Sequence, residues 1–380
     1  MPTPKELLTH AWWSAIAEPA DLQIHALRLA LGDDDAQQWI LTDPPGPLPT
    51  ILTSRQPHAT WERAWNRWHP RAIAANPESD LADLDLLGGH LLIPTSPNWP
   101  TGLDDLGPAA PTTLWVRGTP PVETSLAIVG ARAATPQGTR TARDLAAGAA
   151  AHHIPVISGG AFGIDIAAHT GALDGGGTTT VILAGGLANP YPAAHSHIYE
   201  QILNSGGALI SEVPPSWRPA KWRFLERNRL IAALAGATIV VEASHRSGAL
   251  ATARRAMDLG RDVGAVPGPL SSSASMGCHD LIRNGATLIR HSDDALELLG
   301  AIGETGDPTL FGAPVEKDHG INALPAEQRR VWEALPARSV TTLDRLIRAS
   351  GLGRSEVLGA LGYLELRGLI RSDATGWARR

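Results

Sequence analysis

Short apolar runs alternate with amphipathic helical stretches between residues 88 and 300. The runs expected to form strands cover residues 125–129, 155–158, 179–183, 208–211, 238–242, 262–266 and 287–289. The helices expected between them include residues 138–151, 164–173, 195–204 and 248–259. Strands that are apolar on both faces are typical of a parallel sheet covered by helices. The alternation predicts an α/β fold with a doubly wound, Rossmann-like, mostly parallel sheet, whose ligands bind at the carboxyl ends of the strands.

Smaller regions flank this one. Residues 1–80 are rich in tryptophan and predict short helices, for example residues 22–31 and 60–68, separated by the proline-rich stretch 42–49. We expect a small N-terminal helical domain of the SAM or helix-hairpin-helix type. Residues 301–320 are rich in glycine, proline and charge, which favours a linker.

The last region, residues 321–380, predicts a winged-helix domain. Helices are expected at residues 326–335, 342–349 and 354–367, followed by a pair of strands around a glycine. The segment carries ten arginines against six acidic residues. Winged helices bind DNA through the third helix or contact proteins, and both alternatives stay open.

Composition narrows the class of protein. Hydrophobic residues make up 43% and charged residues 18% of 380 residues, and no apolar run is long enough to span a bilayer. Residues 1–10 lack the pattern of a secretion signal, and Cys278 is the single cysteine, so we expect a reducing cytoplasm and no structural zinc or other metal. Only three lysines occur and none follows a glycine-rich loop, which excludes a Walker-type triphosphate site.

A glycine-rich loop follows the expected strand 155–158. Gly159, Gly160 and Gly163 permit a sharp turn, and Ser158 and Phe162 lie among them. A helix beginning after such a loop directs free N–H groups into it, which suits phosphate. The spacing is not that of a dinucleotide fingerprint, and no acidic residue follows at the distance that would bind a ribose, so neither NAD nor FAD nor any other cofactor is expected.

Cations stand near two further strand ends. Arg132 follows the strand 125–129, where ligands of such a sheet bind. In the stretch 221–229, KWRFLERNR, the cations Lys221, Arg223, Arg227 and Arg229 alternate with aromatic residues and Asn228. Arginine and aromatic side chains together suit the backbone and bases of single-stranded nucleic acid.

A third loop, after the strand 238–242, contains Ser247 and Gly248 before the next helix and could offer a hydroxyl and backbone N–H groups to a phosphate. Asp165 and His169 stand one helical turn apart, and we expect a structural pair. Glu212 and Glu242 end strands, but nothing pairs either carboxylate with a nucleophile.

Taken in order, the motifs resemble the DprA (Smf) family of DNA-processing proteins. They are Ile93-Pro, Trp99-Pro, Leu114-Trp-Val-Arg-Gly118, Ile128-Val-Gly-Ala-Arg132, Ser158-Gly-Gly-Ala-Phe-Gly-Ile-Asp165 with His169, Asn189-Pro-Tyr-Pro192, Ser211-Glu212, Arg227-Asn-Arg229, Val241-Glu-Ala243, Ser247-Gly-Ala-Leu-Ala-Thr-Ala253 and Val266-Pro-Gly268. The resemblance covers residues 88–300, and the flanking regions match in layout.

The resemblance implies a function without catalytic turnover. Members bind and protect single-stranded DNA during natural transformation, load the RecA recombinase onto it, and act as homodimers. Carried over to this sequence, the DNA-facing groups are Arg132, the loop 158–163, Lys221, Arg223 and the triplet 227–229. Family members usually have a basic residue where this chain has Phe162, and a proline where it has Leu225, which puts one phosphate contact in doubt.

One enzyme class shares this fold. Nucleotide phosphoribohydrolases of the LOG type cleave a base from a nucleoside monophosphate and carry a Pro-Gly-Gly-x-Gly-Thr-x-x-Glu signature. The segment Pro267-Gly268-Pro269 lacks its further glycines and its acid. We keep this class as the alternative to a DNA-binding protein.

Overall fold

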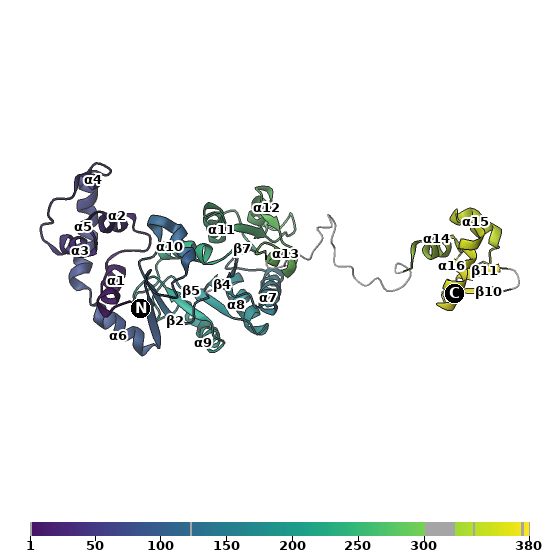
Figure 1. Ribbon diagram of the computed structural model, residues 1–380, viewed down its shortest axis with the longest axis horizontal. Helices are drawn as coiled ribbons and strands as arrows, with labels where there is room; N and C mark the ends of the chain where they lie inside the picture. The colour runs from purple at the N-terminus through teal and green to yellow at the C-terminus, as the bar shows by residue number, and fades with distance from the viewer. Residues whose placement is uncertain (1, 122–123, 301–323, 337–338, 374–375, 380) are drawn as a thin grey trace. The chain divides into compact units, whose positions relative to one another are not determined.

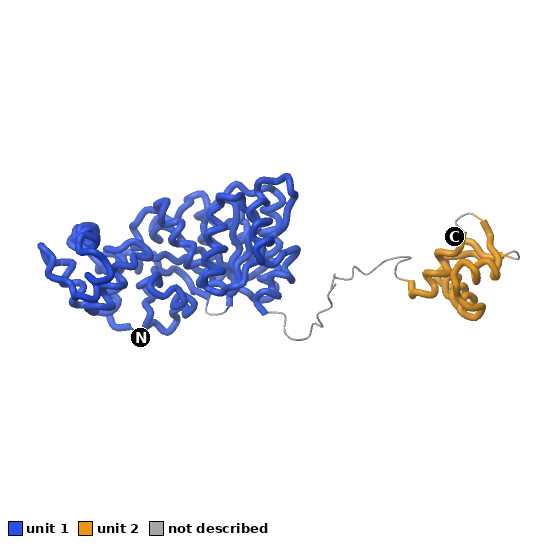
Figure 2. The backbone as a smooth tube through the Cα atoms, turned by 90° about the horizontal axis from the view of Figure 1, so that it is seen from above, with its two compact units in different colours: residues 1–305 blue, residues 306–380 orange. Residues whose placement is uncertain are grey.

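The computed structural model describes residues 2–121, 124–300, 324–336, 339–373 and 376–379. The chain forms two compact units, Met1–Thr305 and Gly306–Arg380, which we treat separately (Figure 2). The expected linker, residues 301–320, lies outside the described residues.

A single sheet of nine strands, counted over the described residues, organises the first unit. Its strands are β1 (Gly89–Leu92), β2 (Leu114–Gly118), β3 (Leu126–Val129), β4 (Val156–Gly159), β5 (Thr179–Ile182), β6 (Ala208–Ser211), β7 (Ala237–Val240), β8 (Asp262–Ala265) and β9 (Thr287–Leu288). Their spatial order is β1-β2-β6-β5-β4-β3-β7-β8-β9. All pairs from β6 to β9 in that order are parallel, which confirms the predicted fold class.

Two antiparallel strands at one edge were not predicted. β1 pairs with β2, and β2 pairs with β6, both antiparallel. β1 begins with a glycine and a histidine, and β2 ends with an arginine and a glycine, so neither shows the continuous apolar run on which the strand predictions rest.

Helices cover both faces of the sheet, as Figure 1 shows. One face carries α7 (Pro136–Ala151), α8 (Ile164–Asp174), α9 (Ser196–Asn204) and α13 (Ser292–Glu297); the other carries the 3₁₀ helix η1 (Thr101–Ala109), α10 (Lys221–Leu234), α11 (Gly248–Asp258) and α12 (Met276–Arg283). Side chains alternate between the faces: Ala127 and Val129 pack under α10 and α11, while Leu126 and Ile128 pack under α7 and α8.

The direction of the strand order reverses between β3 and β7. From β3 the chain adds β4, β5 and β6 on one side, then crosses to β7 and adds β8 and β9 on the other. The connecting loops leave these two central strands toward opposite sides, so a crevice opens at their carboxyl ends. This is where a ligand of a doubly wound sheet is expected.

The N-terminal helices form their own tryptophan-rich core. The helices of this core are α1 (Pro4–Ile16), α2 (Leu22–Leu31), α3 (Asp33–Leu41), α4 (Thr50–Thr53) and α5 (His58–Ala74). The next helix, α6 (Pro77–Leu86), packs its Leu84 with β1 and β2 instead. Trp13, Trp61 and Trp68 are fully buried there, and the Trp68 indole donates to Asp21, the N-cap of α2. The helices predicted at residues 22–31 and 60–68 are thus present, the second as part of α5.

The second unit is a small three-helix domain with a two-stranded wing. It contains α14 (Ala326–Ala334), α15 (Leu343–Ser350), α16 (Arg354–Leu366), β10 (Ile370–Asp373) and β11 (Gly376–Arg379). The wing strands are antiparallel, and Thr341 adds a bridge to Trp377. The predicted helices agree with these bounds to within a residue or two. Among the described residues, no helix is long and apolar enough to cross a membrane.

Candidate nucleic-acid interface

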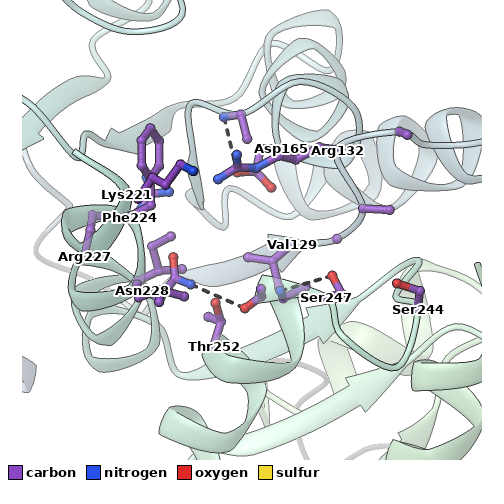
Figure 3. Close-up of a pocket in the computed structure, with 18 of the residues that line it drawn as sticks. Val129, Arg132, Asp165, Lys221, Phe224, Arg227, Asn228, Ser244, Ser247 and Thr252 are labelled. Carbon is purple, nitrogen blue, oxygen red and sulfur yellow. Dashed lines mark hydrogen bonds between the residues drawn. The ribbon is translucent and has the colours of Figure 1, made fainter. Parts of the chain in front are cut away.

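A pocket of about 980 Å³ opens at the reversal point between β3 and β7 (Figure 3). Its lining comes from the loops after β3, β4, β5, β6, β7 and β8 and from the first turns of α8, α10 and α11. The lining residues are Val129, Gly130, Ala131, Arg132, Ala133, Ala161, Asp165, Tyr191, Pro219, Ala220, Lys221, Phe224, Leu225, Arg227, Asn228, Ile231, Ser244, Ser247, Gly248, Ala249, Thr252, Ser273 and Ala274. The pocket therefore lies at the carboxyl ends of the strands, as the sequence predicts.

The glycine loop after β4 is held from behind through its carbonyl groups. His169 Nε2 lies 2.9 Å from the Gly159 oxygen, and His195 Nδ1 and Tyr199 Oη lie 3.0 and 3.3 Å from the Gly160 oxygen. In a trans peptide the C=O and the following N–H point in opposite directions. Fixing the Gly160 carbonyl therefore turns the Ala161 N–H the other way, where it meets Asp165 Oδ2 of the pocket lining at 3.4 Å.

Gly163 completes the loop in a conformation that favours glycine. Its φ is +81°, and a Cβ there would collide with the Ala131 carbonyl oxygen. That same carbonyl accepts the Ile164 N–H at 3.2 Å. The loop is thus fastened against the end of β3, directly beside Arg132.

Asp165 is the one acidic residue lining the pocket in the described chain. Burial raises the pKa of its carboxyl group to about 6, although the nearby Arg227 guanidinium favours the charged form. Gly159 makes room for both groups: a Cβ at that position would lie 2.5 Å from both Asp165 Oδ2 and Arg227 Nη2. Burial also lowers the pKa of His169 to about 4, so its imidazole is neutral while it holds the Gly159 carbonyl of the loop.

Cations and aromatic rings share one wall. The exposed Arg132 guanidinium lies 5.0 Å from the centre of the Phe224 ring, and Phe224 packs edge-on against Tyr191. Lys221 is exposed on the same turn of α10 as Phe224. Arg227 is buried below them; it donates to the Ile182 carbonyl, and its Nε finds no partner among the described residues.

The opposite wall is neutral. Ser247 caps α11 by accepting the Ala249 N–H, Asn228 donates to the Gly248 carbonyl at 3.4 Å, and Thr252 is buried beside them. Figure 3 shows the division, with Arg132, Asp165 and Lys221 on one side of Val129 and Asn228, Ser247 and Thr252 on the other.

Three helices of the described chain begin at this pocket: α8, α10 and α11. Neither α8 nor α10 has a side-chain N-cap, so their first-turn N–H groups are left to other partners. Helix N-termini attract anions through these N–H groups and the helix dipole. Together with Arg132, Lys221 and Arg227, they give the pocket the chemistry of a phosphate site.

The structure brings together only part of the set of residues predicted to face DNA. Those lining the pocket are Arg132, Lys221, Arg227, Asn228, Ser247 and Gly248. Those outside its lining are Ser158, Gly159, Gly160, Phe162, Gly163, Arg223 and Arg229. Among the second group, the glycines shape the loop, whereas three polar side chains are used inside the protein.

Ser158 and Arg229 are corrections to the predicted interface. Ser158 is fully buried and donates to the Ile128 carbonyl across the sheet. Arg229 is 2% exposed and forms a two-pronged pair with Glu212 at 2.6 and 2.7 Å. Both side chains face away from the pocket, so neither reaches a ligand there.

Arg223 also has an internal partner. Its guanidinium donates to the Glu18 carboxylate at 2.8 and 3.0 Å, which ties α10 to the loop after α1. Glu242, the other carboxylate at a strand end, accepts from the backbone N–H and hydroxyl of Thr135. It therefore fixes the start of α7 and takes no part in the pocket.

Phe162 is 49% exposed and packs edge-on against His195, with ring centres 4.5 Å apart. The residue is therefore at the surface and not in the core. It stands at the rim, one residue from Ala161, which lines the pocket.

Sequence reasoning missed Tyr191, Phe224 and Thr252 as lining residues. A usable signal existed for one of them: Phe224 lies one turn after Lys221 and one turn before Asn228, which places the three on one helix face. Among the described residues, no group of His, Cys, Asp or Glu side chains is placed to hold a metal ion.

Comparison with known proteins identifies the family. The family model described as DNA recombination-mediator protein A matches residues 90–300, more than half of the chain. The chain belongs to the DprA family. A second model, the DprA winged helix domain, matches residues 316–375 and confirms the predicted winged helix.

Relatives extend this match along most of the chain. The "Putative DNA processing protein DprA" of Mycobacterium tuberculosis is 45% identical over 313 residues, covering 78% of this chain and 79% of that protein. "Protein Smf" of Escherichia coli is 36% identical over 258 residues, 67% of each chain. The X-ray structure of DprA from Streptococcus pneumoniae has a TM-score of 0.61 at 27% identity and covers 78% of this chain and 98% of its own.

We predict that Arg229→Leu destabilises the fold. The substitution leaves the Glu212 carboxylate without its partner, and breaking a buried pair costs ~3–5 kcal/mol. Chemical denaturation measures this loss, and the double variant Arg229→Leu with Glu212→Leu should recover much of it. A single variant as stable as the wild type would contradict the structural role.

We predict that anion binding in the pocket strengthens as the pH falls through about 6, because protonation removes the Asp165 charge. Asp165→Asn should bind at pH 8 as tightly as the wild type binds at pH 5, and should lose this part of the pH dependence. The same raised pKa lowers wild-type stability as the pH rises from about 4 to about 6. Equal pH profiles for the two proteins would show that Asp165 does not face the bound anion.

Proposed function

We propose that the protein binds single-stranded DNA in the pocket and delivers it to the RecA recombinase, without catalytic turnover. The observation that carries the binding is the convergence of Arg132, Lys221 and Arg227 with three helix N-termini and the rings of Phe224 and Tyr191 in one site. Phosphates bind the cations and N–H groups, and bases stack on the aromatic side chains.

The shape of the site favours a single strand. Its volume of about 980 Å³ is that of a small-ligand pocket, which accommodates a nucleotide or two rather than the width of a duplex. The neutral wall of Asn228, Ser247 and Thr252 offers hydrogen bonds without charge. We propose that a base occupies this side and the phosphates occupy the cationic side.

A hydrolase of the LOG type remains the alternative on the same fold. Glycoside hydrolysis commonly uses two carboxylates, one on each side of the scissile bond. Here Glu212 and Glu242 serve Arg229 and Thr135, which leaves Asp165 as the pocket's acid in the described chain. Incubation with nucleoside monophosphates, followed by chromatography of free base, separates the classes; base release would favour the hydrolase.

The resemblance also supports a cytoplasmic protein that acts as a homodimer during DNA uptake. The assembly state and the delivery to RecA are measured separately. Light scattering reports the mass of the assembly, and RecA filament growth on DNA coated with single-strand binding protein reports delivery. RecA that grows equally fast with and without the protein would overturn the delivery step.

The binding proposal is tested directly with fluorescent oligothymidylate and a duplex of equal length. We expect tighter binding to the single strand and an affinity that falls with salt, at a logarithmic slope of ~0.7 per phosphate contact. Equal affinity for both forms of DNA, or an affinity independent of salt, would contradict it.

We predict that Arg132→Ala weakens binding of the single strand by ~1.5–3 kcal/mol, the range for a charge-assisted contact. Its side chain is exposed and rests on Phe224, so the melting temperature should stay near that of the wild type. Arg143→Ala is the matched control, since Arg143 is half exposed on α7 and does not line the pocket. Equal affinities for the two variants would remove Arg132 from the interface.

We predict that Phe162 stacks on a base at the rim. Phe162→Ala should weaken binding by ~1–3 kcal/mol and Phe162→Trp should preserve it. Phe162→Arg should exchange stacking for a phosphate contact and steepen the salt dependence by roughly one contact. All three variants should fold, because the ring is 49% exposed. An unchanged affinity for Phe162→Ala would show that the strand does not cross this rim.

A further inference from the structure

We propose a second DNA subsite outside the pocket, in which Trp222 stacks a base of the strand as it leaves Lys221, and Glu18 of the N-terminal region is its positioning residue. The inference rests on the proposed single-strand binding and extends it to a surface shared by the N-terminal helices and α10. We call the group Glu18, Arg71, Trp217, Trp222 and Arg223 the tryptophan clasp.

Trp222 is exposed yet held in place. Its side chain is 57% accessible, which is unusual for a ring of this size, while its indole N–H donates to Glu18 Oε2 at 3.1 Å. The hydrogen bond anchors one edge of the ring and leaves much of its surface in solvent. A fixed, open aromatic ring is what a sequence-independent stacking site requires.

The Glu18 carboxylate binds both arginines of the clasp. Its carboxylate accepts from Arg223 at 2.8 and 3.0 Å and from Arg71 of α5 at 2.8 Å, in addition to Trp222. These donors hold the pKa of Glu18 at about 2, so it stays charged. Two guanidinium groups and one carboxylate leave a net positive charge.

Stacking continues through the clasp. The Arg223 guanidinium lies 4.5 Å from the Trp217 ring centre and 5.8 Å from that of Trp222, and Arg71 lies 5.2 Å from Trp217. Arg218 lies beside them; its side chain is exposed and has no partner among the described residues. The surface therefore combines one open ring with spare positive charge, which suits a phosphate backbone with splayed bases.

The subsite is continuous with the pocket. Lys221, Phe224 and Leu225 line the pocket from the first turns of α10, and Trp222 belongs to the same first turn. Successive helix residues are about 100° apart around the axis, since 3.6 residues make a turn, so Trp222 faces the neighbouring side. A strand that passes Lys221 on its way out meets this ring next.

A plain structural clasp is the competing explanation, in which Glu18 only joins the N-terminal helices to α10. The two explanations differ in the effect of strand length. A structural clasp changes stability and leaves the length dependence of DNA binding unchanged, whereas a second subsite contributes only when the oligonucleotide is long enough to reach it.

The experiment measures dissociation constants of the full chain for oligothymidylates of about 4 and about 16 nucleotides, the span of site sizes in single-strand binding folds. Trp222→Ala should weaken binding of the long oligonucleotide by about 5- to 100-fold, as expected for loss of one stacked base. It should leave the affinity for the short oligonucleotide unchanged. Trp222→Phe should keep most of the affinity. Leu270→Ala, at a side chain 90% exposed and outside the pocket lining, is the control.

Glu18→Gln separates positioning from charge. Removing a negative charge should by itself strengthen DNA binding, whereas release of Trp222 should weaken it for the long oligonucleotide alone. We expect the second result. Stronger binding of both lengths would overturn the role of Glu18.

Each failure has a distinct signature. If Arg132→Ala changes neither length, the pocket itself is wrong and the proposed function fails. If Arg132→Ala weakens both lengths while Trp222→Ala weakens neither, or both equally, the pocket stands and the second subsite is wrong. Trp222→Leu, which keeps apolar bulk without an aromatic face, replaces Trp222→Ala if that variant does not fold, and should show the same selective loss.

Discussion

The direction of two peptide groups, at Gly159 and Gly160, determines what the pocket can bind. Their carbonyl oxygens are held behind the loop by His169, His195 and Tyr199. The Gly159 oxygen can only accept, so Nε2 of the neutral His169 ring carries the proton and donates to it. Three side chains thus hold the glycine loop in one conformation, in which the Ala161 N–H points to Asp165 at the pocket. Preorganised donors of this kind need not pay for reorientation when an anion arrives.

Two carboxylates close to these donors and cations show how strongly local contacts decide charge. Glu18 receives four N–H donors and its pKa falls to about 2, although burial opposes ionisation. Asp165 accepts the backbone N–H groups of Ala161 and Gly130, yet its pKa rises to about 6 because burial prevails. Glu18 therefore stays ionised within its cationic cluster. A phosphate bound near Asp165 would favour the protonated, neutral form of that carboxyl group. The Glu18 carboxylate thus serves to hold neighbouring side chains in place, whereas the protonation of Asp165 changes the charge of the pocket.

The sequence predicted the sheet better than the interface, for a physical reason. Continuous apolar strands and helix starts are local patterns, and β6 and α2 fall on the predicted residues. The roles of Arg227, Asn228 and Arg229 depend on which side of α10 each one faces, and adjacent residues of a helix point about 100° apart. Asn228 shares the face of Lys221 and Phe224, while Arg229 turns toward Glu212. Glu212 and Glu18 come from distant segments, so no local pattern in α10 could reveal either partner.

In the winged-helix domain, too, the number of charged residues does not by itself reveal what a helix contacts. Its ten arginines suggested DNA contact through the third helix, and the exposed residues of α16 include Arg354 and Ser355 as well as Leu358, Gly359, Gly362 and Leu366. Base reading in a groove uses Arg, Lys, Asn or Gln side chains, and Arg354, the first residue of α16, is one of these. Leu366 is 90% and Leu358 44% exposed, an apolar surface with a real solvation cost. The surface of this helix therefore combines an arginine at its start with apolar side chains along its length, so a count of charges does not decide between DNA contact and protein contact.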